Sequence, residues 1–397
     1  MSERLENAFF ADPHVYYRRW RQQGPVHRVD FGDGLDRWII LDYDAGRAAL
    51  ADPRLGKDIE RLGEVLARKR GGTWVNSRPS DSLRHMLNAD PPAHTRLRKA
   101  VAKAFNARRV AALQPVIERT AFELLDGMAE YDQVDLLDAF AAQLPVTVIC
   151  HLLDVRIADH ETFREWTKAL VGTLDPQAER AAAHDEMVEF LRKMLQDKRA
   201  DPGDDLLSEL VTDTDALLSE SELVGMALLL LVAGHETTVN LIGNGTLALL
   251  RDRAWWDRLR AEPALVPAAV EEFLRFDGPV DLSTPRFTAE PITVGDTVIP
   301  AGEVVYIALA GANRDPGHFA APDRLDPAAE RTAHLGFGHG PHFCVGAPLA
   351  RLEARVAFTA LPQRFPELRL AVDESELRWY PNPVIRALTG LPVRLAG

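Results

Sequence analysis

Cysteine is scarce in this chain of 397 residues, which contains only Cys150 and Cys344. Two cysteines cannot form a disulfide framework in a chain of this length, so the sequence gives no indication of an oxidising compartment. A lone thiol is usually structural, because free cysteine is among the most often buried residue types. Each cysteine therefore has to be judged by the residues around it.

Long apolar runs are also missing. The longest spans residues 226–234 and is closed by His235 and Glu236, whereas a membrane span needs about 20 apolar residues. The N-terminus is charged from its third residue and does not resemble a signal peptide. Because the chain has no long Gly/Ser-rich or Pro-rich linker and no internal repeat, we expect a single domain, 1–397, in the cytoplasm and without a membrane partner.

Positive charge is in deficit, with 46 Lys and Arg against 59 Asp and Glu and a net charge of −13. This balance argues against a general nucleic-acid or membrane-surface binder. The deficit is uneven, since residues 91–110 carry six basic side chains and no acidic one. Such a basic segment can attract an acidic protein partner.

The spacing of apolar residues predicts a mainly α protein with small β-sheets. Residues 26–41 alternate like a β-hairpin, and short strands are expected at 292–294, 298–299 and 304–306. Helical patterns cover residues 96–105, 111–131, 163–200 and 219–251. Ser219 and Ser221 are candidate N-caps of the last helix, whose centre is apolar on every face, as in a helix that crosses a large core.

Cys344 lies in the loop 337–346, which reads FGHGPHFCVG. Three glycines in ten residues allow positive φ angles and a close approach of the backbone to another group. A helix-forming stretch, 347–357, follows, so we expect the N-terminal end of that helix to lower the pKa of Cys344. A thiolate held in this way can ligate a metal or act as a nucleophile.

Other interpretations of this loop are open on the residues alone. Cys344 can be a buried structural cysteine. A zinc site formed by His339, His342 and Cys344 lacks an evident fourth ligand and leaves Phe337 and Gly346 without a role. A papain-like nucleophile would need a base and an orienting amide that the sequence does not indicate.

The run Phe337-x-x-Gly340-x-x-x-Cys344-x-Gly346 resembles the haem-binding signature of the cytochrome P450 monooxygenases, whose haem iron is held by a Cys thiolate. The resemblance extends along essentially the whole chain and is greatest to actinomycete members that oxidise macrolides and other polyketides. It implies a single-domain P450 fold with a long central helix over haem b, O2 as co-substrate, and Cys344 as the axial ligand of the iron.

Glu272 and Arg275 are spaced i, i+3, so on a helix they share one face and can form an ion pair. Such spacing is common on charged helices and says little by itself. In its position before the cysteine loop, the pair is similar to the structural ion pair of the family. The resemblance implies that His339 completes this group.

Residues 233–238, AGHETT, interrupt the apolar helix. On the residues alone, the threonines can bond to carbonyls one turn back, and Glu236 can be paired with an arginine. A small residue, a carboxylate and a hydroxyl on one turn can also open a groove that leads protons to a cofactor. The stretch is similar to the family's oxygen-activation motif, which implies that Glu236 and Thr237 deliver protons.

His94 and Arg98, spaced i, i+4, can hold one anion, although a solvated basic helix has the same spacing. The resemblance implies that these two residues bind the haem propionates, together with Arg286 and His342. By the same resemblance, a largely apolar substrate pocket is expected from Leu229, Val232, Ala233, Val280, Leu282 and Val384.

The resemblance implies an enzyme that hydroxylates or epoxidises a small lipophilic secondary metabolite. One alternative is oxidative coupling of aromatic rings, but members with that activity often lack the Glu/Thr pair. Another is a haem-binding or sensing protein without catalysis, which would need no proton path. The presence of Glu236 and Thr237 therefore favours monooxygenation over both alternatives.

Electrons have to come from another protein. The chain has no space for a flavin or nicotinamide domain and no second cysteine cluster for an iron–sulfur centre. The resemblance therefore implies a ferredoxin and a ferredoxin reductase as partners of a monomeric enzyme. We expect the ferredoxin to dock on a basic face formed by Arg96, Lys99, Lys103, Arg108, Arg109 and Arg351.

Overall fold

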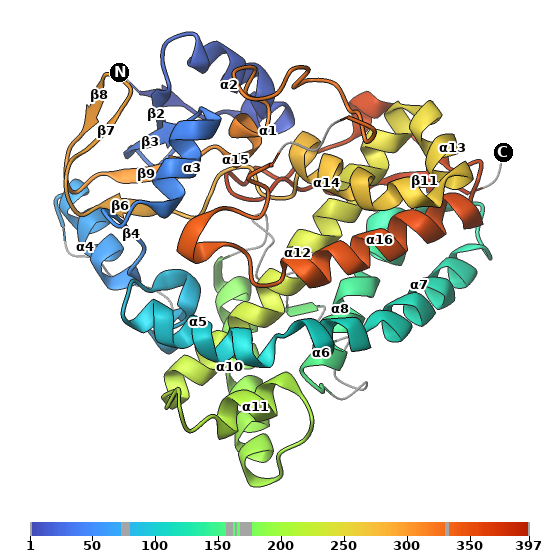
Figure 1. The fold of residues 1–397 in the computed structure, drawn as a ribbon, viewed down its shortest axis with the longest axis horizontal. Coiled ribbons are helices and arrows are strands. Elements are labelled where there is room, and N and C mark those ends of the chain that lie inside the picture. Colours follow the sequence, from blue (N-terminus) through green and yellow to red (C-terminus); the bar gives the residue numbers. More distant parts are fainter. Residues whose placement is uncertain are drawn as a thin grey trace.

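The computed structural model describes residues 2–72, 80–155, 162, 165–166, 177–329 and 333–395. Helices dominate, and they fill the lower and right-hand part of the molecule in the view of Figure 1. Most are as expected, although the first part of the helix predicted at 163–200 falls largely outside the described residues. The α-helices are α1 (Asn7–Ala11), α2 (Pro13–Arg21), α3 (Tyr43–Ala51), α4 (Ile59–Lys69), α5 (Ala93–Ala104), α6 (Ala107–Ala112), α7 (Gln114–Met128), α8 (Gln143–Leu152), α10 (Gln177–Ala200), α11 (Leu206–Thr212), α12 (Glu220–Arg251), α13 (Arg253–Ala261), α14 (Val266–Asp277), α15 (Leu309–Ala312) and α16 (Ala347–Arg364).

The β-structure is small and lies mostly at one side of the molecule (Figure 1). The largest sheet has the order β1-β2-β3-β9-β6-β4, and its β2–β3 pair is the hairpin that the alternation at 26–41 predicts. The expected strands after residue 290 are β7, β8 and β9, and β7 pairs with β8. The strands are β1 (Glu3–Arg4), β2 (Val26–Asp30), β3 (Asp36–Ile40), β4 (Leu55–Gly56), β5 (Gln133–Asp135), β6 (Arg286–Thr288), β7 (Ile292–Val294), β8 (Thr297–Ile299), β9 (Val304–Ile307), β10 (Arg369–Leu370) and β11 (Pro392–Arg394).

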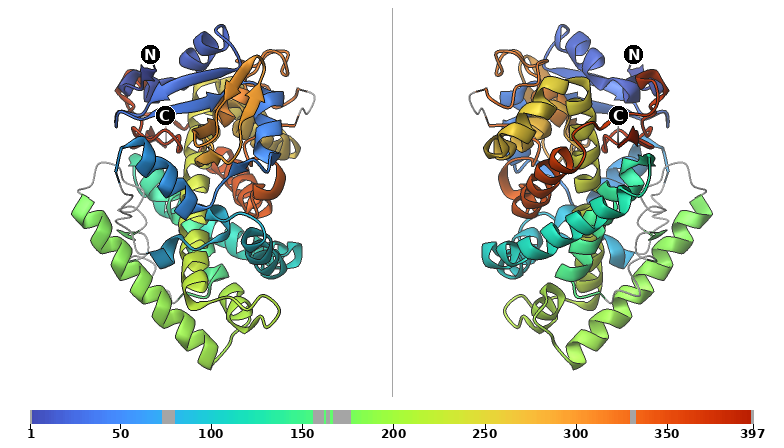
Figure 2. Two further views of the ribbon diagram at one scale, coloured as in Figure 1. Left: turned by 90° about the vertical axis from the view of Figure 1, so that its left-hand side faces the viewer. Right: turned by 90° about the vertical axis from the view of Figure 1, so that its right-hand side faces the viewer.

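Helix α12 runs through the middle of the molecule (Figure 2) and contacts α8, α10, α14 and α16. Ser219 is its N-cap, and the Ser219 hydroxyl and the Glu222 carboxylate form a reciprocal capping box. Ser221, the other candidate cap, lies inside the helix. By length and composition α12 could cross a membrane, but 61% of its most apolar window is buried, which is the pattern of a core helix.

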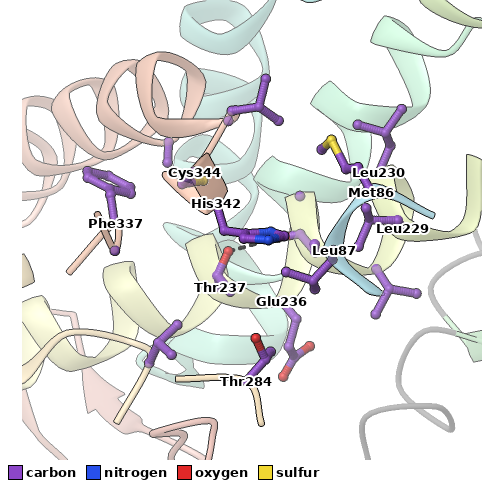
Figure 3. Close-up of a pocket in the computed structure, with 18 of the residues that line it drawn as sticks. Met86, Leu87, Leu229, Leu230, Glu236, Thr237, Thr284, Phe337, His342 and Cys344 are labelled. Carbon is purple, nitrogen blue, oxygen red and sulfur yellow. Dashed lines mark hydrogen bonds between the residues drawn. The ribbon is translucent and has the colours of Figure 1, made fainter. Parts of the chain in front are cut away.

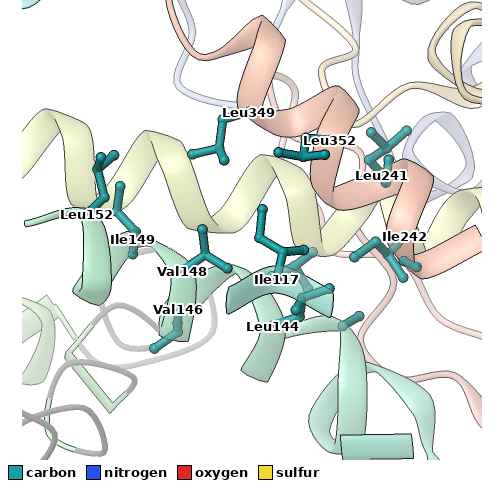
Figure 4. Packing of buried hydrophobic residues seen from close by; sticks show 14 of the residues in the cluster. Ile117, Leu144, Val146, Val148, Ile149, Leu152, Leu241, Ile242, Leu349 and Leu352 are labelled. Carbon is teal, nitrogen blue, oxygen red and sulfur yellow. The ribbon is translucent and has the colours of Figure 1, made fainter. Parts of the chain in front are cut away.

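The main hydrophobic core surrounds α12. Figure 4 shows Leu241 and Ile242 of α12 packed among side chains of α7, α8 and α16, including Ile117, Ile149 and Leu352. Cys150 of α8 is fully buried in the same cluster, as expected for a structural cysteine. This packing holds α12 and α16 in fixed positions relative to each other, which matters because both helices contribute to the site described below.

A buried ion pair joins segments that are far apart in the chain. Arg386 donates from Nε to Asp277 Oδ1 at 3.2 Å, and their side chains are 8% and 9% exposed. The Arg386 guanidinium also bonds to the carbonyls of Phe10 and Ala11, and Asn244 of α12 bonds to the carbonyls of both Asp277 and Arg386. We call Asp277, Arg386 and Asn244 the C-terminal clamp.

The clamp supports two short chain segments that face α12. Val280 and Ile385 form an antiparallel bridge, and the Asp281 N–H donates to the Val384 carbonyl at 2.9 Å. Behind them, the Tyr17 hydroxyl of α2 donates to Asp281 at 2.8 Å. Burial raises the pKa of Asp281 to about 7. The N-terminal helices therefore support the wall formed by these two segments.

Candidate active site

A cavity of about 510 Å³ lies between α12, the Cys344 loop, the segment before α5 and the two clamped segments. Figure 3 shows Cys344 and Phe337 on one side and Glu236 and Thr237 of α12 facing the same space. Its walls are mostly apolar, with leucines of α12, Met86 and Leu87 grouped together. The cavity thus brings together most of the residues that the sequence motifs single out.

The Cys344 loop has the tight geometry that its glycines predict, with one exception. Gly338 and Gly340 both have φ +73°, and a Cβ on Gly340 would come within 3.2 Å of three atoms of α3. Gly346 has an ordinary helical φ of −78° and is the N-cap of α16. The Cys344 N–H donates to the Phe337 carbonyl at 3.0 Å, which closes the loop.

The expected lowering of the Cys344 pKa is wrong for the protein alone. The Cys344 side chain is exposed to the cavity, but the surrounding protein limits its solvation, and this desolvation raises the pKa of the thiol. The backbone N–H groups of Gly346 and Ala347 and the charges of Arg98 and Arg351 act in the opposite direction, but more weakly. These four groups would stabilise a thiolate whose proton is replaced by a metal ion.

Glu236 and Thr237 occupy adjacent positions on the cavity side of α12. The Thr237 hydroxyl donates to the Ala233 carbonyl at 2.8 Å, the bond that its place in a helix predicts. Burial raises the pKa of Glu236 to about 7, against a smaller lowering by the Asn240 amide. Among the described residues, no Lys or Arg forms an ion pair with Glu236. The ionisable side chain nearest to its carboxylate is His235, whose Nδ1 lies 3.9 Å from Glu236 Oε2.

A second buried carboxyl near the cavity has no counterpart in the sequence motifs. Glu353 of α16 is 1% exposed, lines the cavity, and has an Oε2 atom without a hydrogen-bond partner. Burial raises its pKa to about 8, and the Thr238 hydroxyl lowers it by less. The sequence around Glu353 does not indicate that this carboxyl is buried, because charged residues are common in helices. Its burial becomes visible only in the structure, where α16 packs on α12.

Cationic side chains gather at one side of the cavity. His94, Arg98, Arg286 and His342 all line it, as the family resemblance implies, and the ring centres of His94 and His342 are 4.1 Å apart. Lys57 also lines the cavity beside these residues, which the sequence did not predict. It is 3% exposed and donates to the Thr284 hydroxyl. Burial, with the charge of Arg286, lowers the pKa of Lys57 to about 7.

This cluster fits the acid groups of a haem. Arg286 Nε and His94 Nε2 are buried without hydrogen-bond partners, and unpaired buried polar atoms are costly. Burial and the neighbouring cations lower the pKa of His342 to about 2, so the site is short of negative charge. Two carboxylates on a ligand that reaches Cys344 would supply both the missing acceptors and the missing charge.

Glu272 and Arg275 form the expected pair on α14, with two bonds of 2.7 and 2.8 Å. Arg275 also donates to the carbonyls of residues 313, 322 and 324, so the pair fastens the segment before the Cys344 loop. His339 is not among its recorded partners and instead lines the cavity. The histidine that reaches α14 is His334, which precedes the Cys344 loop and whose Nε2 lies 3.1 Å from Glu271 Oε2.

Five of the six expected pocket residues line the cavity, namely Leu229, Val232, Ala233, Val280 and Val384. Leu282 does not; it is fully buried in the hydrophobic cluster that contains Tyr17 and Trp20. The reason is a change of partner, since Val280 bridges to Ile385 whereas Leu282 bridges to Ala308. No pattern in the local sequence shows this change.

The basic face is less free than its composition suggests. Arg96 is paired with Glu222, Arg109 with Glu209 at 2.7 Å, and Arg351 with Glu271 at 2.7 Å. Lys103 lies 3.5 Å from Asp213. Within the described part of the chain, Lys99 and Arg108 are exposed and have no recorded ion-pair partner. The carboxylates that pair with the remaining basic side chains come from distant segments of the chain. Counting charges over residues 91–110 alone therefore does not include them.

Among the described residues, no group of three or more His, Cys, Asp and Glu side chains could hold a metal ion by itself. The zinc interpretation of His339, His342 and Cys344 therefore has no support. Three features occur together here. A cysteine just before a helix faces the cavity, cationic side chains at one side can bind two acid groups, and the central helix presents a carboxyl and a hydroxyl. This combination defines the class of haem-thiolate proteins.

Comparison with known proteins agrees with this class. The model of the family "Cytochrome P450" matches residues 162–377. Cytochrome P450 107B1 of Saccharopolyspora erythraea is 49% identical over 98% of this chain and 96% of its own length. The 6-deoxyerythronolide B hydroxylase of the same organism is 40% identical over 98% of both chains. The structure of the tirandamycin C-bound P450 monooxygenase TamI has a TM-score of 0.91 and 47% identity, covering 99% of this chain and 100% of its own.

The chain therefore belongs to the cytochrome P450 family, and it is a monooxygenase of that family. Membership implies a haem iron and the use of O2. The resemblance of the chain to actinomycete enzymes that oxidise macrolides and polyketides is thereby confirmed.

Proposed function

We propose that this chain hydroxylates or epoxidises a lipophilic, polyketide-like secondary metabolite, using O2 and two electrons from a ferredoxin. The observation that carries the proposal is the placement of Glu236 and Thr237 on the wall of the cavity that Cys344 also lines. The mostly apolar lining suits a lipophilic substrate. The relatives named above for 6-deoxyerythronolide B and tirandamycin C support a polyketide-like compound.

The cofactor of the proposal is haem b, ligated by Cys344, with its propionates held by His94, Arg98, Arg286 and His342. When bound, haem supplies the reductive activation of O2. As the ligand, the Cys344 sulfur would carry a negative charge, which two backbone N–H groups and two arginines would stabilise. The propionate partners fix the orientation of the cofactor beside the apolar wall that positions the substrate.

Burial raises the pKa of Glu236 to about 7, so near neutral pH a large fraction of this carboxyl is protonated and can give up its proton. Thr237 is the next residue, and its hydroxyl can pass a proton into the cavity while it keeps its bond to the Ala233 carbonyl. Oxidative coupling and haem sensing receive less support, since neither would need this pair on the cavity wall. We further propose a single-domain, monomeric, cytoplasmic enzyme.

Proton delivery by this pair predicts a specific pH dependence. In the wild-type enzyme, the fraction of electrons recovered in product should fall as the pH rises through about 7, because Glu236 then loses its proton. Glu236→Gln should remove this inflection and lower product formation by about 10²-fold, the range expected for a lost general acid. The measurement is product and hydrogen peroxide formed per electron consumed, from pH 6 to 8.5.

Thr237→Ala serves as the companion variant. It should divert electrons from product to hydrogen peroxide at every pH, with haem still bound, and should retain the inflection due to Glu236. Unchanged coupling in Thr237→Ala, or an unchanged inflection in Glu236→Gln, contradicts the proposed roles.

The ferredoxin is proposed to dock on the basic face, with Lys99 and Arg108 as its free charges. Lys99→Glu should slow reduction by the ferredoxin by up to about tenfold at low salt. Lys103→Glu should have a smaller effect, because Asp213 and Asp215 already surround Lys103. Stopped-flow reduction of the ferric, haem-loaded enzyme in the presence of CO, which traps the reduced form, measures both effects at two salt concentrations. Equal effects of the two variants, or rates independent of salt, would refute this docking site.

A further inference from the structure

Arg351 of α16 is held in one orientation by two contacts. Its Nε donates to Glu271 Oε1 at 2.7 Å, and its Nη2 donates to Glu271 Oε2 at 2.8 Å. The guanidinium also lies over the ring of Phe337, with its central carbon 4.5 Å from the ring centre. A forked pair of bonds and a stacked ring fix a guanidinium more closely than a single surface ion pair does. The charge of Arg351 therefore has a defined position beside the Cys344 loop.

His334 supports the carboxylate to which Arg351 is bonded. The Gly336 N–H donates to His334 Nδ1 at 3.0 Å, so Nδ1 is the acceptor of this ring and Nε2 carries the hydrogen. His334 Nε2 lies 3.1 Å from Glu271 Oε2 and therefore donates to it. Burial raises the pKa of Glu271, but the bonds from Arg351 and His334 outweigh this effect and bring the pKa to about 2. A neutral ring, a carboxylate and a guanidinium thus follow one another from Gly336 to Arg351.

This group of side chains is connected to the proposed iron ligand. The Phe337 carbonyl accepts the Cys344 N–H at 3.0 Å, and Phe337 and Cys344 lie on the same side of the cavity (Figure 3). Burial raises the pKa of Cys344, and Arg351 is among the groups whose charge acts against this rise. The bond to Glu271 and, more weakly, the charge of Cys344 raise the pKa of Arg351. The sulfur and the guanidinium therefore interact through protein, where charges are screened less than in water.

We propose that Arg351, positioned by Glu271 and His334, raises the reduction potential of the haem iron that Cys344 ligates. A fixed positive charge near the thiolate stabilises the state that has gained an electron, and outer residues of this kind tune a bound metal. Arg351 supplies the charge, whereas Glu271 and His334 are positioning residues. The inference rests on the proposed function, because it assumes a haem ligated by Cys344. It gives Arg351 a role that does not depend on the docking of a ferredoxin.

The test measures the reduction potential of the haem-loaded enzyme by spectroelectrochemistry, without ferredoxin. Arg351→Gln should lower the equilibrium constant for reduction about three- to tenfold, which is about 30–60 mV at 59 mV per tenfold change. Arg351→Lys keeps the charge and should show less than half of this shift in potential. Glu271→Gln keeps an acceptor for the guanidinium but removes the opposing charge, so it should raise the constant about two- to threefold. A merely structural role would not produce shifts of opposite sign in Arg351→Gln and Glu271→Gln.

Two substitutions of His334 test its positioning role. His334→Gln places an amide nitrogen near the position of Nε2, can keep the bond to Glu271, and should retain the wild-type potential. His334→Asn places a carbonyl oxygen near the position of Nδ1, so it can keep the bond from the Gly336 N–H but loses the bond to Glu271. The carboxylate then lacks a donor that partly compensates its charge, and the equilibrium constant for reduction should fall about twofold.

Arg364→Gln is the matched control. Arg364 is on the same helix, pairs with Asp126 at 3.2 Å and lies over the ring of Phe365. It is the last residue of α16, at the end of the helix away from Cys344. Its replacement should therefore leave the reduction potential unchanged.

An unchanged potential in Arg351→Gln, or shifts of the same sign in Arg351→Gln and Glu271→Gln, would overturn the inference. If Arg351→Gln slowed reduction by the ferredoxin without moving the potential, Arg351 would be a docking charge only, and the inference would be wrong.

The proposed function fails separately. A wild-type enzyme whose reduced-CO spectrum lacked the thiolate band would contradict the ligation by Cys344, and with it both the function and this inference. If the band is present and the potentials shift as expected, but the enzyme oxidises no polyketide, the role of Arg351 stands and the proposed reaction does not.

Discussion

Cys344→Ala is expected to abolish monooxygenase turnover and to remove the reduced-CO absorption band that is characteristic of thiolate-ligated haem. The variant removes the thiol sulfur that lines the cavity just before α16. The Gly346 and Ala347 N–H groups and the two arginines near it then have no thiolate to stabilise. We expect turnover to fall by more than about 10³-fold, as for the loss of a group on which the whole reaction depends.

Cys150→Ala is the matched control for this experiment. Cys150 is fully buried in the hydrophobic core and lies outside the cavity lining. Its replacement should cost about 1 kcal/mol of stability, as for loss of a small buried group, while the band and the turnover remain. Survival of the thiolate band in Cys344→Ala, or its loss in Cys150→Ala, would exclude Cys344 as the ligand.

Arg386→Met is expected to lower the free energy of unfolding by about 3–5 kcal/mol. The substitution keeps most of the side-chain volume but removes the arginine bonded to the Asp277 carboxylate, which is 9% exposed, and leaves it with only the more distant charge of Arg314 and the His14 ring 3.8 Å away. It also removes the donors to the carbonyls of Phe10 and Ala11 and the contact of the guanidinium with the Trp379 ring, 3.3 Å from its centre. Equilibrium denaturation measures the change.

Arg251→Gln provides the comparison. Arg251 pairs with Glu374 at the surface, where the two side chains are 40% and 50% exposed. Solvent screens such a pair, so its loss should cost less than about 1 kcal/mol. If both variants lost the same free energy of unfolding, the buried ion pair of the C-terminal clamp would stabilise the protein no more than a surface ion pair does, and the prediction would be wrong.

Features that depend on short stretches of sequence could be predicted well. The hairpin at β2 and β3, the cap of α12 at Ser219, the Glu272–Arg275 pair and the helix after Cys344 all depend on residues within a few positions of one another. Periodicity and capping act at that range. The family motifs are local in the same sense, so most of the candidate site residues were found from them.

What could not be predicted depends on contacts between distant segments. The neutralisation of Arg96 by Glu222 joins residues 126 positions apart, and the burial of Glu353 requires α16 to pack on α12. Leu282 turns away from the cavity because its backbone pairs with Ala308. The Cys344 pKa rises because burial outweighs the helix end, and burial is a property of the folded protein.

The C-terminal clamp also sets an order of events during synthesis. Arg386 lies 376 positions after Phe10, yet it holds the carbonyls of Phe10 and Ala11 and the wall segment next to Val280. Domains form as the chain emerges from the ribosome, N-terminal part first. The segments around residues 10 and 386 can meet only after both have been synthesised, so this part of the cavity wall is completed late, after the elements between them.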